Sequence, residues 1–289
     1  MSNQKRSLTS VHIAVLFFGL AGLFAKMVAQ PAIIITLGRV FFSAIFLLIM
    51  FKVKKTNIRL TSKKDYFLIL IAGTILAVHW TAFMQSIQTS TVAIGTLTFS
   101  TFPLFVTFLE PYFFHERLKI ASIIQGMIML LGVAFIIPGF SLNNTITQGV
   151  LWGMLSAITY AVLSLLNRRF SNKYAGSTIA FYEQGVSTIV LLPALFIIKP
   201  VFSGMDILGL VILGVVFTAV AHSMFIEGLK HIKVHTAGII SSLESVYGII
   251  AAGFILKEIP SVRELIGGAI ILGVVFYSTI ESTKGMEKK

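Results

Sequence analysis

The feature that most constrains this chain is an internal repeat. Residues 98–132 form an apolar run, a tight charged turn at 115–117 and a second apolar run, and residues 240–274 have the same design. A single shift of 142 positions aligns Glu116 with Glu258, Gly126 with Gly268, Leu130 with Leu272, Val133 with Val275, Val92 with Val234, Phe83 with Phe225, Ala77 with Ala219 and Thr36 with Thr178. A chance match of apolar segments would not keep one register over such a distance. A repeat of this kind defines the architecture, so we predict two copies of one unit, 1–146 and 147–289.

The composition places these units in a membrane. The 289 residues are 56% hydrophobic and only 12% charged, with a mean hydropathy of +0.92. Soluble proteins carry about 25% charged residues, so soluble domains could not cover this much apolar surface. The net charge of +12 does not indicate nucleic acid, because the basic residues lie in short loops between apolar runs. There is no cysteine, which excludes disulfides and thiolate metal sites.

Ten apolar runs are long enough to span a bilayer, which takes about 20 residues in a helix. They are 10–29, 33–51, 66–87, 91–114, 119–138, 148–168, 178–198, 207–228, 234–256 and 262–281. The first run resembles a signal peptide, but Lys26 closes it and the repeat pairs it with a helix in mid-chain, so we expect it to be retained. The predicted fold class is an all-α integral membrane protein with ten transmembrane helices.

The positive charges set the predicted orientation. With the N-terminus inside, about eighteen of the 23 Lys and Arg residues fall on the inner side, including the run from Lys52 to Lys64. This bias predicts that both termini are cytoplasmic. Each unit holds five helices, an odd number, so the second unit must cross the membrane in the opposite direction. Two inverted five-helix repeats are typical of carriers that alternate access around a midplane site.

A known family shares these features. The chain places Pro103 in the fourth helix, follows it with the Glu116 turn "FFHERL", repeats that turn as "ILKEIP", and carries Arg39 in the second helix. In this order and spacing the chain resembles the EamA-type transporters of the drug/metabolite transporter superfamily over essentially its full length.

The resemblance implies a secondary carrier that exports amino acids or related small metabolites, with a central cavity lined by helices 1, 3, 4, 6, 8 and 9. The chain departs from the common family pattern in two places. Glu110-Pro111 stands ahead of the turn, and Tyr160-Ala161 lies opposite Phe18-Gly19 in place of the usual aromatic-glycine pair. These departures bear on the substrate and not on the fold.

Ionisable residues within the membrane are functional candidates, because a central charge costs at least about 2.5–3.5 kcal/mol to insert. Glu244 lies roughly 15 Å from the cytoplasmic edge at 1.5 Å per residue, near the middle of a ~30 Å core. His222 lies about 9–10 Å from the same edge by the same count, so the two can meet across adjacent helices. Such a pair can bind a proton near neutral pH or hold a substrate's amino group. Alternatively, Glu244 is protonated and only joins helices.

Further candidates share the expected cavity helices. His79 and Trp80 would form a wall with a polar group and a flat face, or would simply pack between helices. Pro103 interrupts its helix and frees a carbonyl, and Arg39 would bind a carboxylate or pair structurally. The aromatic residues that complete this set are Phe99, Tyr160 and Tyr247.

Other acidic residues have simpler expected roles. Glu110, Glu183 and Glu227 are predicted near the cytoplasmic surface, where they would snorkel or pair with Arg117, Lys173 or Lys230. Glu116 and Glu258 sit at helix ends and are expected to tie the tight turns.

No sequence motif supports an enzyme. The chain has no GxxxxGK[ST] loop, no HExxH and no GxSxG, so neither ATP-driven transport nor catalysis is predicted, and no cofactor or metal. The sequence therefore predicts a multi-pass protein of the cell (inner) membrane that moves a small-molecule substrate by alternating access, as an exporter or exchanger. Its partners are that substrate and the lipid bilayer, without nucleic acid, and proton coupling and a homodimer are left open. The alternatives are a lipid-linked sugar flippase of the same architecture and a membrane scaffold without transport.

Overall fold

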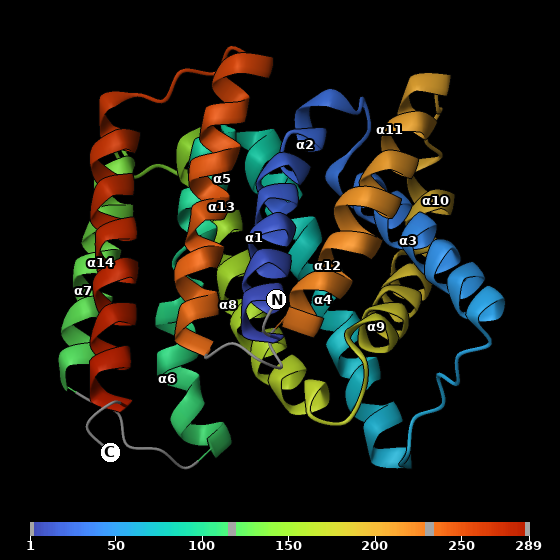
Figure 1. The fold of residues 1–289 in the computed structure, drawn as a ribbon. Coiled ribbons are helices and arrows are strands. Elements are labelled where there is room, and N and C mark those ends of the chain that lie inside the picture. Colours follow the sequence, from blue (N-terminus) through green and yellow to red (C-terminus); the bar gives the residue numbers. More distant parts are fainter. Residues whose placement is uncertain (1–2, 115–119, 229–233, 287–289) are drawn as a thin grey trace.

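A computed structural model describes residues 3–114, 120–228 and 234–286 of the chain. Within these ranges the fold is entirely helical (Figure 1). The elements are, in chain order, α1 Asn3–Ala21, α2 Phe24–Met27, α3 Ala32–Lys54, α4 Lys63–Thr89, α5 Val92–Phe99, α6 Phe102–Phe114, α7 Ile120–Ile136, α8 Thr145–Ser171, α9 Gly176–Leu191, α10 Pro193–Ile198, α11 Gly204–Gly214, the π-helix η1 Val215–Val220, α12 Ala221–Gly228, α13 Val234–Ile255 and α14 Val262–Met286.

Seven segments of the described chain are long and apolar enough to cross a membrane. They are Lys5–Met27, Ala32–Lys54, Lys63–Thr89, Val92–Phe113, Thr145–Ser171, Gly176–Ile198 and Gly204–Gly228, and the shorter apolar helices Ile123–Ile136 and Ile240–Ile255 accompany them. Their outer sides expose Ile49, Val53, Phe67, Phe196 and Ile197. Soluble monomers rarely expose apolar patches of this kind, so the predicted class of helical membrane protein is confirmed. The number of crossings and the side of the termini stay predictions.

The helix ends follow from local sequence signals. A Ser, Thr or Asn side chain accepts a hydrogen bond from a first-turn backbone N–H and so satisfies one free donor. Such N-caps are Ser62 on α4, Thr91 on α5, Asn144 on α8 and Ser203 on α11. At the opposite ends of α3 and α10, Lys55 and Lys199 adopt left-handed backbone conformations with φ of 50° and 49°. These residues end the helices sharply and permit short connections.

Helix packing recurs between the two parts of the chain. The shift of 142 positions relates α1 to α8, α3 to α9, α4 to α11–α12, α5–α6 to α13, and α7 to α14. Accordingly α1 packs on α12 in the same way as its equivalent α8 packs on α4. Likewise α1 packs on α13, and α8 packs on the equivalent helices α5 and α6. The equivalent helices α7 and α14 pack on each other at one side of the molecule (Figure 1). The helix contacts of one half of the chain therefore recur at equivalent positions in the other half.

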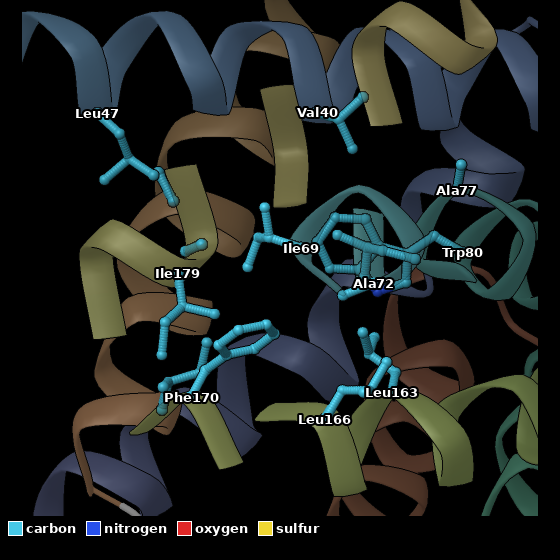
Figure 2. Packing of buried hydrophobic residues seen from close by; sticks show 14 of the residues in the cluster. Val40, Leu47, Ile69, Ala72, Ala77, Trp80, Leu163, Leu166, Phe170 and Ile179 are labelled. Carbon is cyan, nitrogen blue, oxygen red and sulfur yellow. The ribbon is translucent and has the colours of Figure 1, made fainter. Parts of the chain in front are cut away.

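The largest apolar cluster holds α3, α4, α8 and α9 together (Figure 2). Its buried members include Val40, Leu47, Ile69, Ala72, Trp80, Leu163, Leu166, Phe170 and Ile179. Gly73 brings α4 close to α9, because a Cβ at this glycine would lie 2.7 Å from the backbone oxygen of Glu183. Small residues allow such close approach in membranes. As a result, the side of α9 that carries Glu183 is buried.

Glu258 ties helix ends together, as the sequence predicts, but it does so across helices. Its carboxylate accepts a hydrogen bond of 3.0 Å from the backbone N–H of Val92, at the start of α5, and lies 3.9 Å from Lys26 Nζ. The free N–H groups of a helix start favour a negative charge. The equivalent Glu116, with the rest of the turn 115–117, lies outside the described residues.

Candidate functional site

A small cavity lies where the two units meet. Its volume is about 40 Å³, which is room for roughly three water molecules at 10–15 Å³ each. Its lining residues are Phe18, Ala21, Arg39, His79, Trp80, Phe83, Phe99, Tyr160, His222 and Glu244. They belong to α1, α3, α4, α5, α8, α12 and α13. The helices expected from the family resemblance are all represented, and the second helix joins them through Arg39.

Arg39 supplies a fixed positive charge to the cavity. It lies on α3 with 2% of its surface exposed. Its Nε donates a hydrogen bond of 3.1 Å to Thr218 Oγ1 on η1, and its Cζ lies 3.9 Å from the centre of the Trp80 ring. Gly214 permits this approach, because a Cβ there would lie 2.9 Å from the Arg39 backbone oxygen. The guanidinium stays protonated, so it is suited to binding an anionic group.

Glu244 lies on the same cavity wall with the opposite charge. It is buried in α13 and interacts electrostatically with Arg39. Within the described part of the chain, its carboxylate has no hydrogen-bond or ion-pair partner. Gly19 fixes its position, because a Cβ at that glycine would lie 2.8 Å from the Glu244 backbone oxygen. A carboxylate held at a cavity wall in this way can accept hydrogen bonds from a cationic or donor group of a ligand.

Aromatic rings surround the charged groups. Ring centres lie 4.9 Å apart for His79 and Tyr160, 5.2 Å for Phe99 and Tyr160, and 5.5 Å for Phe83 and Phe99. His79 is held by Ser156, whose backbone oxygen and Oγ lie 3.0 Å and 2.9 Å from His79 Nδ1. Aromatic faces accept both apolar groups and cations. The cavity thus combines a cation, an anion and several flat apolar surfaces.

His222 pairs with Glu183 and not with Glu244, so the predicted partner was wrong. His222 Nε2 lies 3.1 Å from Glu183 Oε2, and Glu183 is 0% exposed. The other carboxylate oxygen, Oε1, is buried without a hydrogen-bond partner among the described residues. The expectation that Glu183 snorkels to the surface was also wrong, because α9 turns this residue toward α4 and α12.

The repeat itself contained the signal for this pair. The shift of 142 positions places His222 on Trp80 and places Glu183 two residues after the equivalent of Arg39. Because Arg39 contacts Trp80 between α3 and α4, the equivalent helices α9 and α12 were the place to look for a second charged contact. Depth in the membrane alone gave no such indication.

Two sequence candidates lie outside the cavity lining. Pro103 stands at the second position of α6, directly after the break between α5 and α6 at Ser100 and Thr101. Ser100 Oγ lies 2.6 Å from Ser245 Oγ, which attaches this break to α13. Tyr247 packs in an apolar cluster between α1, α12 and α13.

The remaining acidic residues have partners on other helices. Glu110 forms an ion pair of 2.5 Å with Arg168, and Glu227 Oε2 accepts a hydrogen bond of 3.2 Å from the backbone N–H of Gly176. Lys173 pairs with Asp65 at 3.3 Å. The predicted partners Arg117 and Lys230 lie outside the described residues. Among those described, no group of three His, Asp or Glu side chains is arranged to hold a metal ion.

The family follows from comparison with known proteins. The model of the EamA-like transporter family matches residues 6–137 and again residues 147–280. The chain belongs to the EamA-like transporter family. As an EamA protein it is a transporter and a multi-pass membrane protein. The predicted family and membrane location are confirmed.

Relatives of this EamA protein are also named as transporters. It is 24% identical to the uncharacterized transporter YxxF of Bacillus subtilis over 272 residues, 90% of this chain and 85% of the relative. It is 24% identical to an S-adenosylmethionine uptake transporter of Rickettsia felis, covering 87% and 84% of the two chains. It is 22% identical to the pseudopaline exporter CntI of Pseudomonas aeruginosa, covering 73% and 74%.

One solved crystal structure shares the fold of this EamA protein. It superposes with a TM-score of 0.70 over 96% of this chain and 98% of the other, at 18% sequence identity. At this identity the likeness concerns the fold alone.

Proposed function

We propose that this protein is a secondary transporter that moves amino acids or related small metabolites across the cell membrane by alternating access, as an exporter or exchanger. The observation that carries the proposal is a buried cavity between two similar units, with Arg39 and Glu244 on its walls. Carriers built from inverted repeats place their substrate near the midplane, where the repeats meet.

The proposed topology is ten transmembrane helices in two inverted units, 1–146 and 147–289, with both termini in the cytoplasm. The recurring helix contacts support two equivalent units, and the family model matches the chain twice. Lys173 and Asp65 form an ion pair at one end of the helices. This pair joins two of the segments that the charge distribution assigns to the cytoplasm.

The proposed substrate carries a carboxylate and an ammonium group. Arg39 would bind the carboxylate and Glu244 the ammonium, while Trp80, Phe99 and Tyr160 would contact the rest of the molecule. S-adenosylmethionine, in the name of several relatives, contains the amino-acid part of methionine. The aromatic surfaces suit either its adenine ring or its positive sulfonium group.

The alternatives fit the cavity less well. A scaffold without transport needs no internal space, yet the cavity reaches the carboxylate of Glu244. A lipid-linked sugar would need a largely apolar chamber, whereas this cavity has Arg39 and Glu244 on its walls.

Counterflow in liposomes tests the proposal. The purified protein is reconstituted into liposomes loaded with an unlabelled probe, and uptake of the labelled probe is followed for S-adenosylmethionine, phenylalanine, lysine and glutamate. We expect labelled probe to accumulate above protein-free liposomes for at least one of the four. If none of these amino acids accumulates, the proposed substrate class is wrong.

A further inference from the structure

The Glu183–His222 pair takes no part in the proposed contacts with substrate, yet it adjoins the cavity. His222 is one of the lining residues, and Glu183 lies behind it on α9, fully buried. The start of α9 and the end of α12 lie together, joined by the Gly176–Glu227 hydrogen bond. Counted from these two helix ends at 1.5 Å per residue, Glu183 and His222 both lie about 10 Å into the helices. A buried ion pair is weak evidence for stability, so another role is to be sought.

Symmetry shows what the pair replaces. In the first unit, α3 and α4 meet through Arg39 and Trp80. In the second unit, the equivalent helices α9 and α12 meet through Glu183 and His222. Arg39 therefore contacts Trp80 in the first unit, and Glu183 contacts His222, the equivalent of Trp80, in the second unit. The first unit has a cation that cannot lose its proton, and the second has two groups that both can.

The pair can hold a single proton, because His222 Nε2 and Glu183 Oε2 lie 3.1 Å apart. With one proton the pair is neutral overall, and without it the pair carries one negative charge. The charged or titratable side chains that line the cavity together with His222 are Arg39 of α3, His79 of α4, Tyr160 of α8 and Glu244 of α13, and Glu227 lies five residues further along α12. The helix α1 presents the ring of Phe18, 6.5 Å from that of His222.

We propose that Glu183 and His222 form the proton-binding site of this transporter, separate from the substrate contacts at Arg39 and Glu244. This inference rests on the proposed function. A proton from cavity water binds the pair and is held between His222 Nε2 and Glu183 Oε2. It returns to water from His222 after the cavity has opened to the other side of the membrane. Transport driven by a pH gradient then requires both side chains.

The test is a ratio measured in liposomes. Uptake of whichever of the four labelled probes shows counterflow is measured with and without an imposed pH gradient, and the gradient-driven rate is divided by the counterflow rate. A gradient of one pH unit can drive up to about tenfold accumulation per coupled proton, so we expect this ratio to rise with the gradient in the wild type. In Glu183→Gln, which keeps the shape but loses the charge, we expect no response to the gradient.

Two further variants make the outcome decisive. His222→Gln should lose the gradient response as well, and it serves if Glu183→Gln does not fold. Glu110→Gln removes a carboxylate of the Arg168 ion pair, away from the cavity, and should respond like the wild type. Counterflow without any gradient response in the wild type, or a normal response in either pair variant, overturns this inference. Absence of counterflow in the wild type overturns the proposed function instead.

Discussion

Arg39 shows why the identity of one side chain matters at this site. The guanidinium donates to Thr218 through Nε and its Cζ lies over the Trp80 ring, 3.9 Å from the ring centre, while it still lines the cavity. A planar group with donors on several sides can meet these demands together. A lysine ammonium can supply the charge but neither the stacking nor this fixed orientation. Arg39 therefore positions its charge as well as providing it.

Arg39→Lys is predicted to weaken binding of an α-amino acid while keeping the positive charge. A hydrogen bond to a charged group contributes about 1.5–3 kcal/mol, so the half-saturation concentration in counterflow should rise by at least about tenfold. Glu110→Gln is the control, since its ion pair with Arg168 lies away from the cavity. An unchanged half-saturation concentration would show that Arg39 does not bind the substrate.

Glu244→Gln is predicted to discriminate between ligands with and without an amino group. The variant should bind phenylalanine more weakly than the wild type does, but phenylpyruvate, which lacks the ammonium group, equally well. The reason is that only the ammonium gains from a carboxylate partner. Binding is measured by thermal shift of the purified protein with each compound. Equal weakening of both compounds would contradict the assigned role of Glu244.

Sequence reasoning found the charged residues of the cavity but not all of their partners. Counting residues from the membrane edge identified Glu244 and His222, because burial of a charge depends on depth. The same count placed Glu183 near the surface, since depth says nothing about which face of α9 turns inward. That face is decided by the close packing of α9 on Gly73, a contact between residues far apart in the sequence.

At the scale of helices, the boundaries were largely predictable and the interruptions were not. Apolar length and caps such as Thr91 and Asn144 set where helices begin. Pro103 pointed to a break in the fourth helix, and the break lies directly before it. The equivalent helix α13 is continuous from Val234 to Ile255, and the π-helix η1 that holds Thr218 had no sequence signal. Such local distortions depend on packing with neighbouring helices.

Gly19→Ala is predicted to force α1 away from α13. The added Cβ would lie 2.8 Å from the Glu244 backbone oxygen and 2.9 Å from Tyr247 Cβ. Overpacking of this kind costs about 1–3 kcal/mol, so the thermal unfolding temperature in detergent should fall. The matched control is Gly185→Ala on α9, whose Cβ would meet nothing within 4 Å. There the gain in helix propensity, up to about 1 kcal/mol, should leave stability equal or higher.

If Gly19→Ala and Gly185→Ala unfold at the same temperature, the backbones of α1 and α13 are not in close contact at Gly19. In that case the position of Glu244 on the cavity wall would have another cause.

At the scale of the whole molecule, the pairing of helices across the two parts of the chain follows the repeat. Under the shift of 142 positions, the contact of α1 with α12 is equivalent to the contact of α8 with α4. The contact of α1 with α13 is likewise equivalent to the contacts of α8 with α5 and α6. What the repeat could not predict is where the units differ, since Arg39, Glu183 and Glu244 have Phe181, Phe41 and Phe102 at their equivalent positions. The site is built from these differences, while the fold is built from the similarity.

The central claim, that the cavity opens alternately to the two sides of the membrane, is tested most directly by labelling a cysteine at Ala21. The chain has no cysteine of its own, and Ala21 lines the cavity. A membrane-impermeant maleimide is applied to right-side-out and to inverted vesicles, with Asn143→Cys and Lys173→Cys as markers of the two faces. The account predicts that Ala21→Cys reacts from both sides, while each marker reacts from one side only and the two from opposite sides. Reaction of Ala21→Cys from a single side, or of both markers from the same side, would contradict it.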